Sequence, residues 1–358
     1  MAAVKKHLSF SHTSFCKYQA VSTCPFRPYY LSLQPKIRSQ RRSTVVSVQR
    51  KPDREMSGDV EAAKKAAAQE AVRQNFPDRP RFVGIGSGTT IVYVVDAIKE
   101  LGADTSRIGF VPTGDQSKQL IVKAGLNPVE FEALPDDAMI DIAFDGADEV
   151  DSELNCIKGG GACLYQEKLV AMRAKIFVCV ADHRKLQGKL LTKWPTIPIE
   201  VEPKAARQVL ARLRTLGSRS SSGAGPSVRE GKGTKAGPVK TDQNFVIIDA
   251  PFPQPLLTHA DVATGKATDG TKGIWEVEEL ARAIKEIHGV LAVGLFCGPT
   301  GPEAQAAGVI GGQRPVACYF GMMDGSVEVR KASEKSPDVL AKDPSLKPAV
   351  SKAATGGA

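Results

Sequence analysis

The chain has 358 residues, of which 42% are hydrophobic and 24% charged, and its formal net charge is +9. This length allows one or two domains with a sizeable core, the composition is ordinary for a globular protein, and no apolar run is long enough to span a bilayer. Residues 1–56 hold eleven Lys/Arg against two Asp/Glu, so they account for the whole net charge. Because the rest of the chain is neutral, the basic net charge is no evidence for a nucleic-acid surface on it.

The N-terminal stretch 1–56 is rich in Ser, Arg and Lys and almost free of acidic residues. That composition is typical of an organelle transit peptide, and it also fits a disordered tail ahead of an alternative start at Met56. The seven cysteines of the chain are scattered without a CxxC pair. An odd, unpaired set argues against a disulfide framework and structural zinc, and it favours a reducing compartment.

Helices and strands alternate between residues 57 and 194. The helical segments carry apolar residues at three- and four-residue spacing, and the strands are short apolar runs bounded by turn residues. In chain order we expect helix 60–73, strand 82–86, helix 91–100, strand 108–111, helix 116–124, strands 129–131 and 139–144, helix 162–173 and strand 175–180. This alternation predicts an α/β domain with a Rossmann-like, doubly wound and mainly parallel sheet.

A different pattern follows Pro195. Strands at 197–201, 245–249 and 290–296 and helices at 205–216 and 277–287 predict a smaller ferredoxin-like α+β domain over 195–289, for a lid or for oligomerisation. Its Gly/Ser/Lys-rich stretch 217–237 is expected to be a flexible insertion. We expect 290–330 to return to the first domain and the Lys/Ala/Ser/Pro-rich stretch 331–358 to form a disordered tail.

The first predicted strand leads through a glycine-rich turn, Gly84–Thr90, into a helix. Backbone amides and hydroxyls at a helix N-terminus can bind phosphate. The candidate ligands are Ser87, Gly88, Thr89 and Thr90. A dinucleotide fingerprint would need glycine at position 89, and the Gly-Lys-Ser/Thr of a Walker A loop is missing. A tight turn without a ligand explains the glycines equally well.

Carboxylates and a lysine gather after the predicted strand 139–144. Asp145-Gly-Ala-Asp148 follows it directly, and Lys158-Gly-Gly-Gly161 and Glu167 come soon after. Ligands of open α/β sheets bind at the carboxyl ends of strands, and paired carboxylates with a lysine can move protons and stabilise negative charge. This cluster therefore predicts acid–base chemistry on a small, oxygen-rich anion.

Each member of this cluster also has a plainer explanation. Asp145 and Asp148 could cap a helix or bind a metal, although no histidine lies near them in the sequence. Glu167 taken alone is typical of an exposed helical charge. His183 and Lys185 follow another strand, where Lys185 suits a phosphate and a solvated loop charge about equally.

Taken together, these motifs resemble the ribose-5-phosphate isomerase type A family, in its eukaryotic branch. The matching segments, in the family's order and spacing, are Gly84–Thr90, Asp145–Glu149, Lys158–Gly161, Glu167–Lys168, Ala181-Asp182 to Lys185, Thr241-Asp242 and Gly294–Phe296. The resemblance covers about residues 57–330. Departures are Gln243 in place of a common Asn, Thr113-Gly114 in place of a Ser-rich stretch, and a longer 217–237 segment.

The resemblance implies interconversion of D-ribose 5-phosphate and D-ribulose 5-phosphate through an enediolate, in the non-oxidative pentose phosphate pathway. No metal or organic cofactor is implied. Glu167 would be the base, Lys158 would stabilise the enediolate, and Asp145 would assist ring opening and proton movement. Asp148 would orient Lys158 or a sugar hydroxyl. The implied substrate-binding residues are Ser87, Gly88, Thr89, Thr90, Gly146, Ala147, Gly159, Gly160, Gly161 and Lys185.

The implied partners and location are those of a metabolic enzyme. We expect a homo-oligomer, dimer or tetramer, that binds a small sugar phosphate and neither nucleic acid nor a membrane. We expect a cytoplasmic location, or a plastid or mitochondrion if residues 1–56 act as a transit peptide. Two other classes stay open: a sugar-phosphate-sensing regulator, which needs a basic DNA-reading helix, and a nucleotide-dependent dehydrogenase, which needs a complete glycine fingerprint.

Overall fold

The structure is a computed structural model that describes residues 54–231, 237–266, 270 and 273–333. These residues belong to one compact unit, Lys51–Ala358. Most of the expected extension and tail therefore lies outside the described residues, and the partition of the body into separate domains stays a prediction. Among the described helices, none combines the length and the apolar character that crossing a membrane requires.

A seven-stranded sheet, in the order β14-β13-β7-β4-β1-β2-β3, forms the larger part of the fold. Its strands are β1 (Phe82–Ile85), β2 (Gly109–Pro112), β3 (Asn127–Pro128), β4 (Ile142–Asp145), β7 (Phe177–Asp182), β13 (Ala317–Gly321) and β14 (Val327–Lys331). All neighbours are parallel except β13 and β14. In chain order the parallel strands lie as 3-2-1-4-5-6, which is the doubly wound Rossmann order. The Rossmann-like prediction is confirmed.

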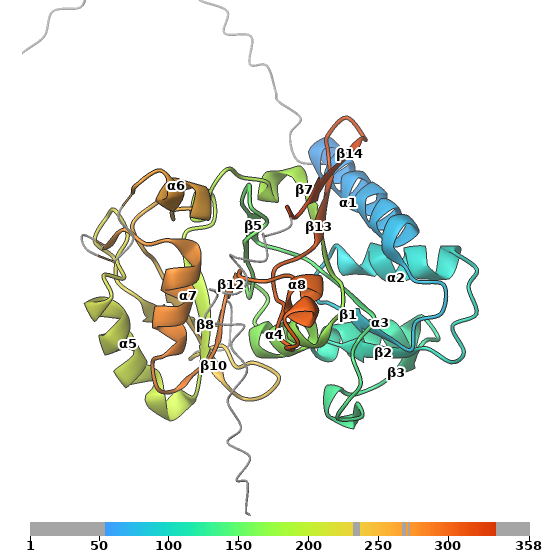
Figure 1. The fold of residues 1–358 in the computed structure, drawn as a ribbon, viewed down its shortest axis with the longest axis horizontal. Helices are drawn as coiled ribbons and strands as arrows, with labels where there is room; N and C mark the ends of the chain where they lie inside the picture. The colour runs from blue at the N-terminus through green and yellow to red at the C-terminus, as the bar shows by residue number, and fades with distance from the viewer. Residues whose placement is uncertain (1–53, 232–236, 267–269, 271–272, 334–358) are drawn as a thin grey trace, which may run out of the picture. The chain divides into compact units, whose positions relative to one another are not determined.

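Helices cover both faces of this sheet, as Figure 1 shows. They are α1 (Arg54–Asn75), α2 (Ile91–Glu100), α3 (Asp115–Lys123) and α4 (Leu164–Arg173). Successive strand residues point to opposite faces. Along β4, Ile142 and Phe144 join the core with α1, α2 and α3, whereas Ala143 joins the core with α4. Burial on both faces explains why the inner strands β1, β2, β4, β7 and β13 are continuous apolar runs in the sequence.

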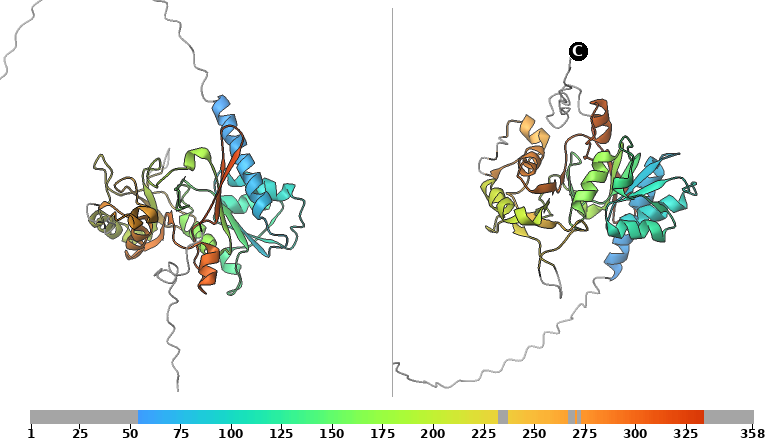
Figure 2. Two further views of the ribbon diagram at one scale, coloured as in Figure 1. Left: turned by 45° about the horizontal axis from the view of Figure 1, so that its top comes forward. Right: turned by 90° about the horizontal axis from the view of Figure 1, so that it is seen from below.

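A second, fully antiparallel sheet has the order β11-β8-β10-β9. It comprises β8 (Ile197–Val201), β9 (Ser227–Val228), β10 (Val246–Ala250) and β11 (Val290–Val293), with α5 (Ala206–Thr215), α6 (His259–Ala263) and α7 (Val277–Lys285) along the chain. If the short helix α6 is set aside, the order of these elements along the chain is the β-α-β-β-α-β order of ferredoxin-like folds. Figure 2 shows α5 and α7 on this sheet, and both contribute to its core. The helix α4 contacts β8 and β11 as well as β4, so it packs against both sheets.

A small sheet of β12 (Leu295–Phe296), β6 (Cys156–Ile157) and β5 (Glu149–Val150) links the two larger ones. The run 290–296, expected to be one strand, divides between β11 and β12 at Gly294. A Cβ there would lie 2.5 Å from the Lys158 carbonyl oxygen and 2.6 Å from that of Pro198. Only glycine allows so close a backbone approach. The return to the larger part of the fold therefore follows Val293 and does not begin at residue 290, because β11 pairs with β8.

Other expectations also differ from the structure. The helix α1 begins at Arg54, so the end of the expected extension is helical. The strand expected at 129–131 is β3 at 127–128, followed by a 3-10 turn at Phe131–Ala133. The stretch 217–237 is not flexible throughout, because it contains β9, which pairs with the edge of β10. The expected tail begins too early, because Lys331 ends β14. Short α8 (Gly301–Ala306) and the strands β13 and β14 were not among the expected elements.

Candidate active site

The site lies where the large sheet changes its winding direction, between β1 and β4. Ligands of doubly wound folds bind at the carboxyl ends of such neighbouring strands. The two ends approach closely at Gly86, whose N–H donates to the Phe144 carbonyl at 2.8 Å. A Cβ at Gly86 would lie 2.0 Å from the Asp145 carboxylate. The fold thus brings together the Gly84–Thr90 turn and the Asp145–Asp148 segment, which are far apart in the sequence.

A pocket of about 280 Å³ opens at this point. The predicted residues that line it are Ser87, Gly88, Thr89, Thr90, Gly146, Ala147, Asp148, Lys158, Gly159, Gly160, Gly161, Glu167 and Lys185. Asp145 is buried and is not among the lining residues. The pocket is also lined by Lys64, Gln116, Asp182 and Arg184. Lys64 and Gln116 were not expected here, because neither belongs to a recognisable motif. Lys64 lies in the Ala-rich helix α1, and Gln116 lies in the first turn of α3.

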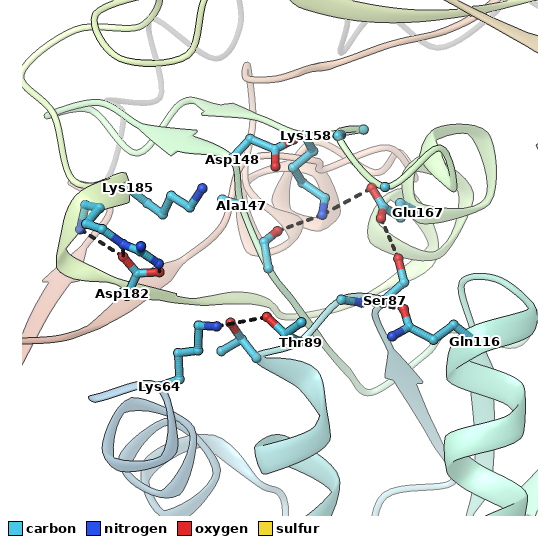
Figure 3. Close-up of a pocket in the computed structure, with 17 residues that line it drawn as sticks. Lys64, Ser87, Thr89, Gln116, Ala147, Asp148, Lys158, Glu167, Asp182 and Lys185 are labelled. Atoms are coloured by element: carbon cyan, nitrogen blue, oxygen red, sulfur yellow. Dashed lines mark hydrogen bonds and ion pairs between the residues drawn. The ribbon is translucent and has the colours of Figure 1, made fainter. Parts of the chain in front are cut away.

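The centre of the site is Lys158, which lies between two carboxylates. Its Nζ is 2.8 Å from Asp145 Oδ2 and 3.2 Å from Glu167 Oε2, and it donates to the Gly146 carbonyl at 2.7 Å. The three charged side chains are only 3–5% exposed. Ser87 Oγ donates to Glu167 Oε1 at 2.8 Å and so orients that carboxylate. Figure 3 shows the side chains of Lys158 and Glu167 pointing toward one another in the same part of the pocket.

Burial raises the pKa of Asp145 to about 8, with Lys158 opposing the rise and Glu167 adding to it. Burial alone would lower the pKa of Lys158, but the Asp145 and Glu167 carboxylates outweigh it and hold that pKa above its usual value. The 2.8 Å ion pair with Asp145 therefore keeps Lys158 charged in this buried site.

Asp148 braces the glycine loop that follows Lys158. Its Oδ2 accepts a hydrogen bond from the Gly160 N–H at 2.8 Å, rather than one from Lys158. Burial raises the pKa of Asp148, while the Gly160 N–H and the charge of Lys158 work against the rise. Because Asp148 also lines the pocket, its other oxygen can meet a bound sugar.

The other side of the pocket is cationic. Figure 3 shows Lys64 and Lys185 there, away from Glu167. Lys64 is buried to 8% exposure, and its Nζ donates to Thr89 Oγ1 at 2.9 Å and to Glu61 at 2.7 Å. The turn beside it opens α2, whose N-terminal amides favour anions. Two ammonium groups and a helix N-terminus together suit a phosphate.

Charged residues at the end of β7 and in the turn after it also line the pocket. Arg184 holds Asp182 in a two-pronged ion pair, with Nε–Oδ1 at 2.6 Å and Nη2–Oδ2 at 3.0 Å. Burial works to raise the pKa of Asp182, but Arg184 outweighs it and keeps that pKa below its usual value. His183 is absent from the pocket lining. Of the two residues weighed here from the sequence, only Lys185 faces the pocket.

Asp145 and Asp148 do not form a joint ligand set, since one carboxylate faces Lys158 and the other faces Gly160. Within the described part of the chain, the only converging group of three possible ligands is Cys156, Cys179 and Cys318, whose sulfurs lie within 4.8 Å of one another. All three are buried in the apolar core under α4. Structural zinc takes four ligands, and here the thiols serve as small apolar packing groups.

The fold and the pocket are those of an α/β enzyme for acid–base chemistry on a small anion. The chain belongs to the ribose 5-phosphate isomerase A (phosphoriboisomerase A) family, whose model matches residues 109–307. It is 43% identical to a ribose-5-phosphate isomerase of Schizosaccharomyces pombe over 276 residues, which is 76% of this chain and 85% of that protein. It is 43% identical to one of Candida albicans over 272 residues, 75% of this chain and 96% of the relative.

Solved structures support the same assignment. Ribose 5-phosphate isomerase A of Methanocaldococcus jannaschii superposes with a TM-score of 0.57 at 29% identity, covering 76% of this chain and 99% of that one. A D-ribose-5-phosphate isomerase solved in complex with phospho-erythronic acid gives a TM-score of 0.58 at 29% identity, with the same coverage. The Plasmodium falciparum enzyme, at 23% identity and a TM-score of 0.59 over 76% of this chain and 100% of that one, shows the shared fold.

Proposed function

We propose that this protein interconverts D-ribose 5-phosphate and D-ribulose 5-phosphate, a step of the non-oxidative pentose phosphate pathway. The observation that carries the proposal is the position of Lys158. It lies between the carboxylates of Asp145 and Glu167 on the wall of a pocket whose other side holds Lys64 and Lys185. Such a pocket can hold a phosphate at one end and move protons at the other.

The pocket fixes the direction in which the substrate binds. The phosphate would lie against Lys64, Lys185 and the Thr89-Thr90 turn, which leaves C1 and C2 of the open sugar near Lys158 and Glu167. Phospho-erythronic acid, the ligand of the solved relative, has a phosphate at one end and a carboxylate at the other. A carboxylate resembles the two oxygens of an enediolate, so such a ligand suits a pocket with these two ends.

Glu167 would act as the base. Its carboxylate, oriented by Ser87, takes the proton from C2, and the electron pair of that bond forms a C1–C2 double bond while the C1 carbonyl oxygen gains negative charge. Lys158 stabilises this charge, which grows only on the way to the enediolate. Glu167 then returns the proton to C1, and the carbonyl forms at C2. No hydride or electron leaves the substrate, so the reaction requires no redox cofactor.

The two aspartates take separate roles in this proposal. Asp145 is paired with Lys158, accepts a hydrogen bond from the N–H of Gly146 and does not line the pocket, so it would hold Lys158 in place and balance its charge. Asp148 lines the pocket and has a raised pKa, so it would carry the proton that moves between the sugar oxygens and help open the furanose ring. This assigns to Asp148 a part of the chemistry that the resemblance gave to Asp145.

The experiment that tests the function is a coupled assay for ribulose 5-phosphate, formed from ribose 5-phosphate in the presence of EDTA. We expect saturable turnover without added metal or nucleotide. Turnover that depends on NAD would favour the dehydrogenase alternative, and sugar-phosphate binding without turnover would favour the regulator.

We further propose that the protein is a homo-oligomer and is cytoplasmic. The support is the family resemblance, in which the smaller α+β part serves oligomerisation. Light scattering of the eluted protein tests the first proposal, and a single-chain mass would contradict it. A fluorescent reporter fused to residues 1–56 tests the second, and import into a plastid or mitochondrion would contradict it.

A further inference from the structure

An arginine from outside the pocket holds the loop that carries Lys158. Arg229 directly follows β9, and its side chain is 17% exposed. Its Nη1 donates to the carbonyl oxygens of both Gly159 and Gly160, at 3.0 Å each. The sequence stretch around it was expected to be a flexible insertion, so no motif pointed to this residue.

A carboxylate fixes the direction of this arginine. Arg229 Nε lies 2.8 Å from Asp249 Oδ2 and Nη2 lies 2.6 Å from Asp249 Oδ1, a two-pronged pair that sets the plane of the guanidinium. The backbone on both sides is also fixed, since the Arg229 N–H donates to Ile247 at 2.7 Å and its carbonyl accepts from Val239 at 2.9 Å. The antiparallel sheet therefore presents Nη1 to the loop as a rigid donor.

The loop needs such a support. Gly159 has φ +99°, a left-handed conformation that costs glycine little, and glycines lose more conformational freedom on ordering than any other residue. Asp148 holds the loop from the pocket side, through the Gly160 N–H, and Arg229 holds it from the outside, through the two carbonyls. The two hydrogen bonds direct both carbonyl oxygens toward Arg229. Since Arg229 does not line the pocket, these oxygens are turned away from an anionic substrate.

We propose that Arg229, oriented by Asp249, is a positioning residue for the isomerase reaction. It holds the Lys158–Gly161 loop so that Lys158 Nζ stays at its distance from Glu167, and it touches neither the substrate nor the reacting atoms. The ferredoxin-like part of the fold thereby sets the geometry of a lysine that directly follows β6 of the small sheet. This inference rests on the proposed function, because Lys158 matters to it as the group that stabilises the enediolate.

The test compares Arg229→Ala, Arg229→Lys and Asp249→Asn with the wild type in the ribulose 5-phosphate assay. Because displacement of a reacting group by about 1 Å can cost ~10²-fold, we expect kcat to fall roughly 10- to 100-fold in Arg229→Ala with KM changed less than about threefold. Arg229→Lys keeps the charge but loses the fork, so its kcat should fall less. The matched control is Arg282→Ala, which removes an exposed arginine paired with Glu279 on α7 and should leave both constants unchanged.

Two measurements separate positioning from a purely structural role. Circular dichroism and the melting temperature show whether each variant is folded at the assay temperature. With substrate deuterated at C2, the isotope effect on kcat should rise in Arg229→Ala and in Asp249→Asn, because a displaced Lys158 slows the proton-transfer step. If Arg229→Ala is unfolded, Arg229→Lys carries the same two readouts.

A folded Arg229 variant with wild-type kcat and isotope effect would overturn the inference. A loss of kcat that is fully explained by the fraction of unfolded protein in the sample would also overturn the inference. If the wild type itself forms no ribulose 5-phosphate, the proposed function fails, which is a result distinct from either of these.

Discussion

Replacement of Lys158 by methionine separates its catalytic charge from its packing. Methionine keeps most of the side-chain volume beside Phe296, whose ring centroid lies 5.3 Å from Lys158 Nζ, but it removes the cation. If Lys158 stabilises the enediolate, its loss resembles removal of an oxyanion donor, which costs ~2.7–4 kcal/mol, or roughly 10²–10³ in kcat. The phosphate is bound at the other end of the pocket, so KM should change by only a few-fold.

The same substitution leaves Asp145 and Glu167 buried without their counter-charge. Breaking a buried pair costs ~3–5 kcal/mol if the remaining groups stay ionised. The pKa of Asp145, already raised to about 8 by burial, should rise further, so the folded variant binds a proton that the unfolded chain releases above about pH 4. Its free energy of unfolding should therefore fall as pH rises above about 4, and this fall should continue to a higher pH than in the wild type, where Asp145 loses the proton near pH 8.

The assay measures kcat and KM for ribose 5-phosphate in Lys158→Met and in Lys185→Met, which is the same substitution at the cationic end. Lys185→Met should raise KM with little change in kcat, since the phosphate is charged in both the ground and transition states. A Lys158 variant with wild-type kcat and a raised KM would refute this reasoning. The roles of the glycine loop and the Gly84–Thr90 turn would then have to be exchanged.

Three further outcomes follow from the structure. Burial lowers the pKa of Lys168 to about 7 in the folded protein, whereas its pKa in the unfolded chain lies near 10.5. The wild-type free energy of unfolding should therefore fall as pH drops from about 10 to 7. Urea titrations of Lys168→Met should show no such fall, and an unchanged pH dependence would contradict the prediction. EDTA should leave kcat unchanged because side chains move the proton, and activity restored by a divalent ion would refute that. A shortened protein that starts at Lys51 should keep wild-type kcat and KM, since the pocket-lining residues run from Lys64 to Lys185. A shortened protein that folds but is inactive would contradict this.

Local patterns predicted the central strands β1, β2, β4 and β7 of the larger sheet, but not β13 and β14. These central strands are buried on both faces, so they stand out as apolar runs between amphipathic helices. In α2, for example, Ile91, Val94, Val95 and Ile98 lie on one face. The site followed from the same logic, because polar residues that directly follow such strands gather at one edge. Thus Ser87, Asp145 and Lys185 could be named without knowing any distance between them.

The missed features depend on contacts between distant segments. Lys64 belongs to the pocket only because α1 packs beside α2 and carries it to Thr89. Arg229 lies in a Gly/Ser/Lys-rich stretch of weak periodicity, and its partners Gly159, Gly160 and Asp249 are set by the pairing of β9 with β10. The division of 290–296 likewise follows from the close approach of Gly294 to two other backbones. Single-segment patterns carry no information on such approaches.

The central claim is that Glu167 moves the proton between C2 and C1. The most direct measurement is turnover of ribose 5-phosphate by Glu167→Gln, which keeps the hydrogen bond from Ser87 but cannot accept a proton. The account predicts a kcat at least ~10²–10⁴-fold below wild type, with the melting temperature and substrate binding close to those of the wild type. A folded Glu167→Gln protein with near-wild-type kcat would contradict it.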